Sequence, residues 1–210
     1  MKCKTIYGLK HLLLVLIFFT HIEAKDKQYL EYILQSEGKI IGKMTIVEKE
    51  NELITKMTIN ISSVFFTYFY TYIEKSFYKN KELVSFEIME NDDGKIKKIK
   101  ALKKGNHLVY SNETILDIKG IDVSAFKINK EFLARNIGKK SFTIKTYDAF
   151  EAKKLQVHYT LKNKNNKSYT FEVLNSRKEK ELRVYTKNAV LIYFENDFFQ
   201  ASLLKKEEYK

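Results

Sequence analysis

The chain has 210 residues, of which 44% are hydrophobic and 30% are charged, and its formal net charge is +12. The one cysteine, Cys3, lies before the first apolar run, and the chain has only four histidines. The rest of the chain therefore has no thiolate for disulfides, iron–sulfur clusters or cysteine-ligated zinc. A single domain of this length can bury an adequate core without disulfides.

The first 24 residues differ in composition from the rest of the chain. Lys2, Lys4 and Lys10 precede or flank the start of the apolar run LLLVLIFF at 12–19, and the segment ends at the small residue Ala24. This order is typical of a secretory signal peptide, cleaved after Ala24 or nearby. The run is too short for a spanning helix, which needs about 20 apolar residues. We predict export to the periplasm of a Gram-negative bacterium, with a signal peptide at 1–24 and a single β domain at 25–210.

The dominant hydrophobic period in the remaining chain is two. In 53–61 the sequence LITKMTINI largely alternates apolar and polar residues, and 42–50 and 155–161 repeat the pattern. This alternation is typical of antiparallel strands with one solvated face. Turn-forming residues recur at short intervals, at 36–39, 49–51, 79–81, 91–95, 103–106, 163–167, 176–180 and 195–197. The sequence therefore predicts an all-β single domain, a strongly curved antiparallel sheet or barrel-like meander of about ten strands.

One interval breaks this alternation. The sequence NKEFLARNIG predicts a short helix near 129–136, with Asn129 as N-cap and Gly138 just past its end. This connection would separate two groups of strands, 27–110 and 140–208.

The segment SVFFTYFYTYIEKSFY, residues 63–78, concentrates aromatic side chains on both faces of one predicted strand. One interpretation is a ligand-binding wall formed by Phe66, Tyr68, Tyr70 and Tyr72, because buried tyrosines need partners for their hydroxyls and suit a half-polar cavity. The other is plain core with a covered back face. The sequence leaves both interpretations open.

Motifs that carry chemistry are absent from the sequence. It has no serine elbow, phosphate loop, paired-histidine helix or glycine-rich nucleotide motif. Glu74 is the only acid within the aromatic strand, and if buried it would need a lysine or several hydrogen-bond donors as partners. We expect no catalytic residues, no metal and no cofactor, and hence no enzyme.

The segment KIKKIKALKK, residues 95–104, is strongly basic. Its six lysines could mark a sheet edge, where Lys discourages edge-to-edge pairing, or a patch that docks on an anionic membrane surface. Nucleic acid is not expected, because the chain is predicted to be exported and has few arginines. The lysines concerned are Lys95, Lys97, Lys98, Lys100, Lys103 and Lys104.

Several segments resemble a family of exported bacterial proteins known only as a domain of unknown function. These are the opening YILQSEGKIIGKMTI, the aromatic strand closed by Glu74, the turn NDDGK and the segment SAFKINKEFLAR. The resemblance implies an exported, mostly antiparallel β protein, and it supplies no catalytic residues.

Together these observations predict a non-catalytic exported β protein that binds a lipid or another apolar or amphiphilic ligand. The alternative is a structural or interaction protein of the cell envelope, with a filled core and no ligand.

Overall fold

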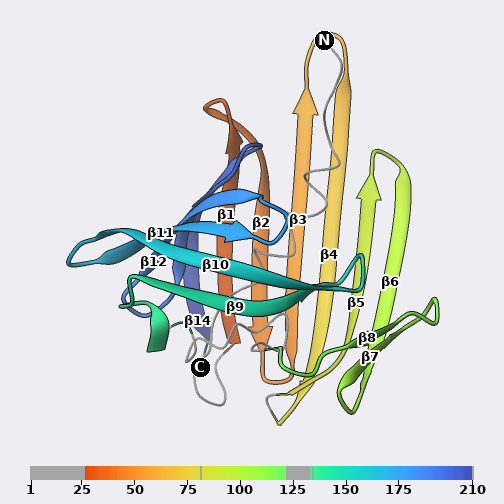
Figure 1. Cartoon of the computed structure of the whole chain (residues 1–210). Helices are drawn as coiled ribbons and strands as arrows, with labels where there is room; N and C mark the ends of the chain where they lie inside the picture. The colour runs from red at the N-terminus through yellow and green to blue at the C-terminus, as the bar shows by residue number, and fades with distance from the viewer. Residues whose placement is uncertain (1–26, 81, 122–132, 134, 210) are drawn as a thin grey trace.

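The computed structural model describes residues 27–80, 82–121, 133 and 135–209 (Figure 1). The predicted signal peptide lies outside the described residues. The described chain forms fourteen strands: β1 (Lys27–Ser36), β2 (Lys39–Lys49), β3 (Glu52–Ser62), β4 (Thr67–Lys79), β5 (Glu82–Asp92), β6 (Lys95–Lys104), β7 (His107–Tyr110), β8 (Ile115–Asp117), β9 (Ser141–Asp148), β10 (Lys153–Lys164), β11 (Ser168–Asn175), β12 (Lys180–Thr186), β13 (Leu191–Glu195) and β14 (Gln200–Tyr209).

All fourteen strands belong to one antiparallel sheet. Its order is β8-β7-β6-β5-β4-β3-β2-β1-β14-β13-β12-β11-β10-β9, so every neighbouring pair is consecutive in the chain except β1 with β14. The sheet thus consists of two meanders, the first half-sheet (β1–β8) and the second half-sheet (β9–β14), joined at that pair. In Figure 1 the strands β9 and β10 cross the strands of the first half-sheet at a steep angle.

The all-β prediction is confirmed, but the strand count is wrong. The structure has fourteen strands rather than about ten, because short strands such as β7, β8 and β13 extend the sheet beyond the strongly periodic segments. Of the helix expected near 129–136, only Leu133, Arg135 and Asn136 are described, and all three are helical; the rest lies outside the described residues.

The core lies between the two half-sheets. In β3, Leu53, Met57 and Ile59 are buried while alternate positions are more exposed, as the period of two requires. The turn between β9 and β10 brings Phe150 to 6.0 Å from Tyr72 of β4, measured between ring centroids. Aromatic side chains from both half-sheets therefore meet in one core.

A glycine in β2 allows a close approach of backbone. A Cβ atom on Gly42 would lie 2.0 Å from the Thr58 carbonyl oxygen of β3, which no side chain can accommodate without backbone movement. In β1, opposite Gly42, the register with β2 shifts between Leu34 and Gln35. This point is where β2 stops following β3.

Candidate functional site

The tyrosine-rich face of β4 lies in the core. Tyr70 and Tyr72 are completely buried and Tyr68 is nearly so, whereas Phe66 lies before β4 and is exposed. Of the four residues proposed as a ligand wall, three share the inner face and the fourth lies elsewhere. The contacts seen for these rings are core contacts, and their role as a ligand wall stays a prediction.

Each of these three tyrosines donates its hydroxyl hydrogen to a carboxylate. Tyr68 Oη lies 2.8 Å from Asp92 Oδ1, and Tyr70 Oη lies 3.1 Å from Glu90 Oε1. Both acids belong to β5, whose register places Asp92 opposite Tyr70. The inner face of β4 and β5 is therefore a ladder of hydroxyl–carboxyl pairs, and the hydroxyls are satisfied without a ligand.

Glu74, like Glu90, is an almost completely buried acid of this ladder. Tyr72 Oη donates to Glu74 Oε2 at 2.7 Å, and Ser76 Oγ donates to Oε1 at 2.8 Å. Burial raises the pKa of Glu74 to about 8, although the two hydroxyl hydrogen bonds act in the opposite direction. The expectation that a buried Glu74 needs a lysine or several donors is confirmed by these two hydroxyls. At neutral pH this carboxyl group mostly carries its proton.

The second half-sheet buries a different kind of acid. Glu181 accepts hydrogen bonds from the Arg183 guanidinium, with Nε at 2.8 Å and Nη2 at 2.5 Å, and Arg183 Nη1 donates to Tyr159 Oη at 2.7 Å. Both charged side chains are almost fully buried. This pair was not predicted from the sequence. Its signal was present, because Glu181 and Arg183 occupy the same parity in β12 as the buried Tyr185.

The six lysines of 95–104 do not form one patch. They belong to β6, and strand alternation points Lys98 and Lys100 away from the core, whereas Lys97 lies on the inner side, with its Nζ 5.0 Å from the centroid of the Phe150 ring. Two of the six are paired, Lys100 with Glu87 and Lys103 with Glu82, each at 2.7 Å. The run has β7 as a partner only from Ala101 to Lys104. Residues 95–99 therefore pair on one side only, with β5, whereas the Lys100 carbonyl also accepts from the Ser111 N–H at 2.9 Å.

A two-stranded finger projects from the sheet. The β2–β3 register ends at Gly42 opposite Ile59, and the β4–β5 register ends at Tyr70 opposite Asp92. Beyond these pairs β3 and β4 continue to pair with each other, and at the base the Asp93 N–H also donates to the Phe69 carbonyl, at 2.8 Å. We call residues 60–69 the finger. Figure 1 shows it extending past the tips of the β1–β2 and β5–β6 hairpins.

The tip of the finger holds apolar side chains in solvent. Val64 is 93% exposed, Phe65 is 94% exposed and Phe66 is 57% exposed. Ser63 fixes the turn: its N–H donates to the Phe66 carbonyl at 2.8 Å, and its Oγ accepts from the N–H groups of Phe65 and Phe66 at 3.3 and 3.2 Å. These hydrogen bonds hold the turn in one conformation, with three apolar side chains in solvent at its end.

The finger also stands in an uncharged part of the chain. No residue from 57 to 73 is Asp, Glu, Lys or Arg, although 30% of the whole chain is charged. Sequence reasoning treated these aromatics as one covered strand and missed the finger. The absence of charged residues from 57 to 73, together with Ser63 as a turn residue, could have indicated a hairpin here.

No helix in the described part of the chain is long and apolar enough to span a lipid bilayer. Within residues 27–80, 82–121, 133 and 135–209, no group of three or more His, Cys, Asp or Glu side chains is placed to hold a metal ion.

Two solved structures are similar to this chain, one of them with a TM-score above 0.5. The chain resembles the crystal structure of a β-barrel-like protein of the domain of unknown function DUF1849 from Brucella abortus, with a TM-score of 0.56, 12% identity, and coverage of 88% of this chain and 98% of that chain. A DUF1089 family protein from Pseudomonas aeruginosa matches with a TM-score of 0.43 and 12% identity over 84% of this chain and 92% of that chain. No curated protein matches the sequence.

The sequence itself matches a family over most of its length. The profile described as Domain of unknown function (DUF6134) covers residues 32–195. This confirms the resemblance to an uncharacterised family of all-β proteins. The chain belongs to the DUF6134 family.

Proposed function

We propose that this protein is a non-catalytic, exported binding protein that contacts an apolar or amphiphilic partner through its finger. The observation that carries the proposal is the exposure of Val64, Phe65 and Phe66 at the end of an uncharged hairpin. Export rests on the signal-like sequence at 1–24.

Other hairpins of the same sheet turn differently. The β1–β2 turn uses Glu37 and Gly38 and the β5–β6 turn uses Asp93 and Gly94, all four with positive φ. These turns consist of polar residues and glycine, as expected for solvent-exposed hairpin turns. The finger instead presents phenylalanines, so its composition is not explained by the needs of a hairpin turn.

Burial of the tip would release substantial free energy. Moving one phenylalanine side chain fully out of water contributes roughly 1.5–3 kcal/mol. An isolated two-stranded hairpin is at best marginally stable in water, and contact with an apolar phase would stabilise the finger. Both effects favour attachment by the tip.

The alternative, an envelope interaction protein with a filled core, is favoured by one observation. Tyr70 and Tyr72 are completely buried, and Phe150 packs against Tyr72. In that case the finger would enter a pocket of another protein rather than an amphiphile.

A single tryptophan tests the proposal, because the chain has none. In Val64→Trp the only indole lies at the tip. We expect its emission to shift to shorter wavelength when uncharged dodecyl maltoside micelles are added, as the indole leaves water. Ile115→Trp, at an exposed apolar position of β8, is the matched control and should not shift.

Two serine substitutions complete the test. Phe65→Ser with Phe66→Ser in the Val64→Trp background should abolish the shift, and its unfolding free energy should change by less than about 0.5 kcal/mol because the replaced side chains are exposed. The proposal would be overturned if the emission wavelength of Val64→Trp did not change when micelles are added.

A further inference from the structure

The finger continues into one face of the first half-sheet. On β4 the alternation that buries Tyr70 and Tyr72 turns Phe69 and Ile73 to the opposite side. We call this opposite side of β3–β6 the outer face. Because Phe69 belongs to both, the finger and the outer face form one continuous surface.

The register places cations and apolar side chains in rows across the outer face. Lys56 lies opposite Ile73, Ile73 opposite Met89, and Met89 opposite Lys98, which makes one row over four strands. The next row includes Lys75. A shallow hollow on this face is lined by residues of both rows.

The positive charges of the outer face are not matched by carboxylates. Lys56, Lys75 and Lys98 are exposed and make no ion pair with any described residue. Glu87 lies among them, but it is paired with Lys100 at 2.7 Å. The face therefore has an excess of ammonium groups, in keeping with the net charge of the chain.

Apolar side chains are exposed between these lysines. Met89 on β5 and two residues of β6, Ile96 and Leu102, are all substantially exposed on the outer face. Interleaved lysines and apolar side chains suit the boundary between lipid headgroups and acyl chains, where lysine stems lie along apolar surface and the ammonium groups reach phosphate.

We propose that the outer face of β3–β6, together with the finger, docks on an anionic phospholipid bilayer. This inference rests on the proposed function and names its partner. Charge complementarity favours an anionic lipid surface, because three unpaired ammonium groups lie among exposed apolar side chains on β3–β6, and two of these strands, β3 and β4, carry the finger. Anionic lipids attract such groups within about one Debye length.

The test compares vesicles of phosphatidylcholine alone with vesicles that also contain phosphatidylglycerol, by co-sedimentation. We expect binding to the anionic vesicles, weakened by salt. Replacing Lys56, Lys75 and Lys98 by Gln should weaken this binding by on the order of 100-fold. The micelle response of Val64→Trp should stay unchanged in this variant.

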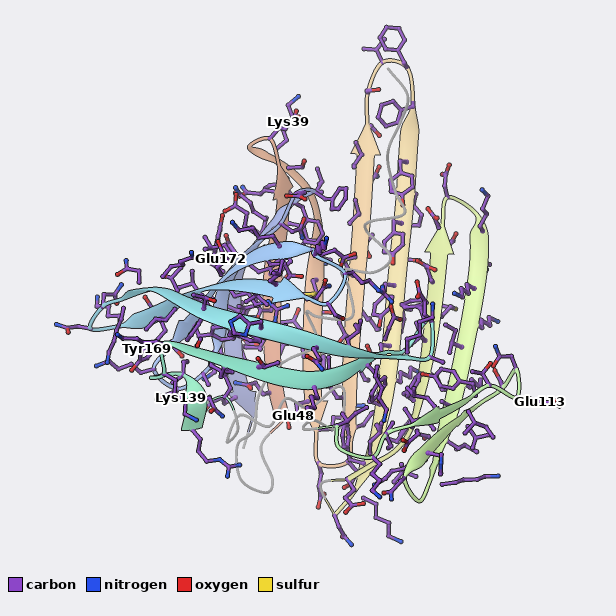
Figure 2. The ribbon with its side chains drawn as sticks, viewed as in Figure 1. Lys39, Glu48, Glu113, Lys139, Tyr169 and Glu172 are labelled. Atoms are coloured by element: carbon purple, nitrogen blue, oxygen red, sulfur yellow. The ribbon has the colours of Figure 1, made fainter. Side chains whose placement is uncertain are left out.

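A matched variant removes the same charge elsewhere. Lys139, Lys167 and Lys187 are exposed lysines outside the first half-sheet, and Figure 2 shows Lys139 far from the finger. Replacing these three by Gln should weaken binding by far less than the outer-face variant does. Equal losses in the two variants would show that only net charge matters, and would overturn the assignment of this face.

The remaining outcomes separate this inference from the proposed function. Absence of binding to anionic vesicles, together with a micelle shift of Val64→Trp, would overturn the bilayer assignment, leave the finger as the site and point to a protein pocket. If the emission of Val64→Trp does not shift with micelles while vesicle binding still depends on the lysines, the finger is not a binding site. The joint surface of finger and outer face would then be wrong as well.

Discussion

The two half-sheets bury a carboxylate in opposite ways. In the first, Glu74 is neutral at pH 7 and accepts hydrogen bonds from two hydroxyls. In the second, Glu181 is held against the Arg183 guanidinium. The comparison shows that a buried acid can be satisfied either by retaining a proton or by a buried counter-charge.

The two arrangements have different consequences. A protonated acid costs little desolvation but makes stability depend on pH, because the unfolded chain releases that proton. A buried ion pair depends less on pH but leaves an uncompensated charge when one partner is lost. The following substitutions separate these consequences, in order of expected size.

Arg183→Met should have the largest effect. It leaves Glu181 buried without its cation, so we expect a loss of about 3–5 kcal/mol of unfolding free energy in urea titrations. Adding Glu181→Gln to this variant should recover part of the loss, because the stranded charge is removed. A double variant no more stable than Arg183→Met would show that packing, and not charge, dominates this site.

Glu74→Gln should change the pH dependence of stability. Burial holds the pKa of the Glu74 carboxyl at about 8 in the folded protein, while in the unfolded chain its pKa is near the ordinary value of 4.5. Between these values the folded state binds more protons, so the wild type should lose stability with rising pH, by on the order of 1 kcal/mol per pH unit.

The variant lacks this titration, so the unfolding free energy of the wild type relative to the variant should fall from pH 5 to pH 8 and then level off. Urea midpoints at intervals over this range provide the measurement. A difference that does not vary with pH would mean that Glu74 is ionised in the folded protein.

Tyr72→Phe should have the smallest effect of the three. It keeps the ring that contacts Phe150 but removes the donor to Glu74, which should cost about 1 kcal/mol. It should also raise the pKa of Glu74 further, because that hydrogen bond favours the ionised form. Tyr29→Phe, which loses a partly exposed hydroxyl bond to Glu31, is the control and should be nearly neutral. Equal losses in both would contradict a special role for the buried acid.

Much of the fold could be predicted from local patterns. The period of two across 53–61 identified β3, and turn residues such as those at 91–95 located several of the hairpins correctly, although not the β3–β4 hairpin. The short strands β7, β8 and β13 escaped because three to five residues contain too little alternation to identify a strand. The pairing of β1 with β14 has no local signature at all.

The candidate site depended on information that local patterns do not contain. Whether Phe65 is covered or exposed is decided by where the β2–β3 and β4–β5 registers end, at Gly42 and Asp92, and these ends depend on distant strands. The basic run was read as one patch, but its alternation in β6 distributes the lysines over two faces. The composition predicted that basic and aromatic side chains would form a surface. Which strand face each side chain occupies depends on the topology of the sheet.

The β1–β14 pairing also bears on how the chain reaches its native state. Every other pair of neighbouring strands is consecutive in sequence and can form as a local hairpin. The β1–β14 pair instead joins Lys27–Ser36 to Gln200–Tyr209. Contacts of such high sequence separation form slowly, since a long loop must close before they contribute. Before β14 pairs with β1, one edge of β1 has unpaired backbone N–H and C=O groups, although β1 is a central strand in the finished sheet. A chain emerging N-terminus first would therefore need its leading strand shielded from other chains, because an open edge is a template for aggregation.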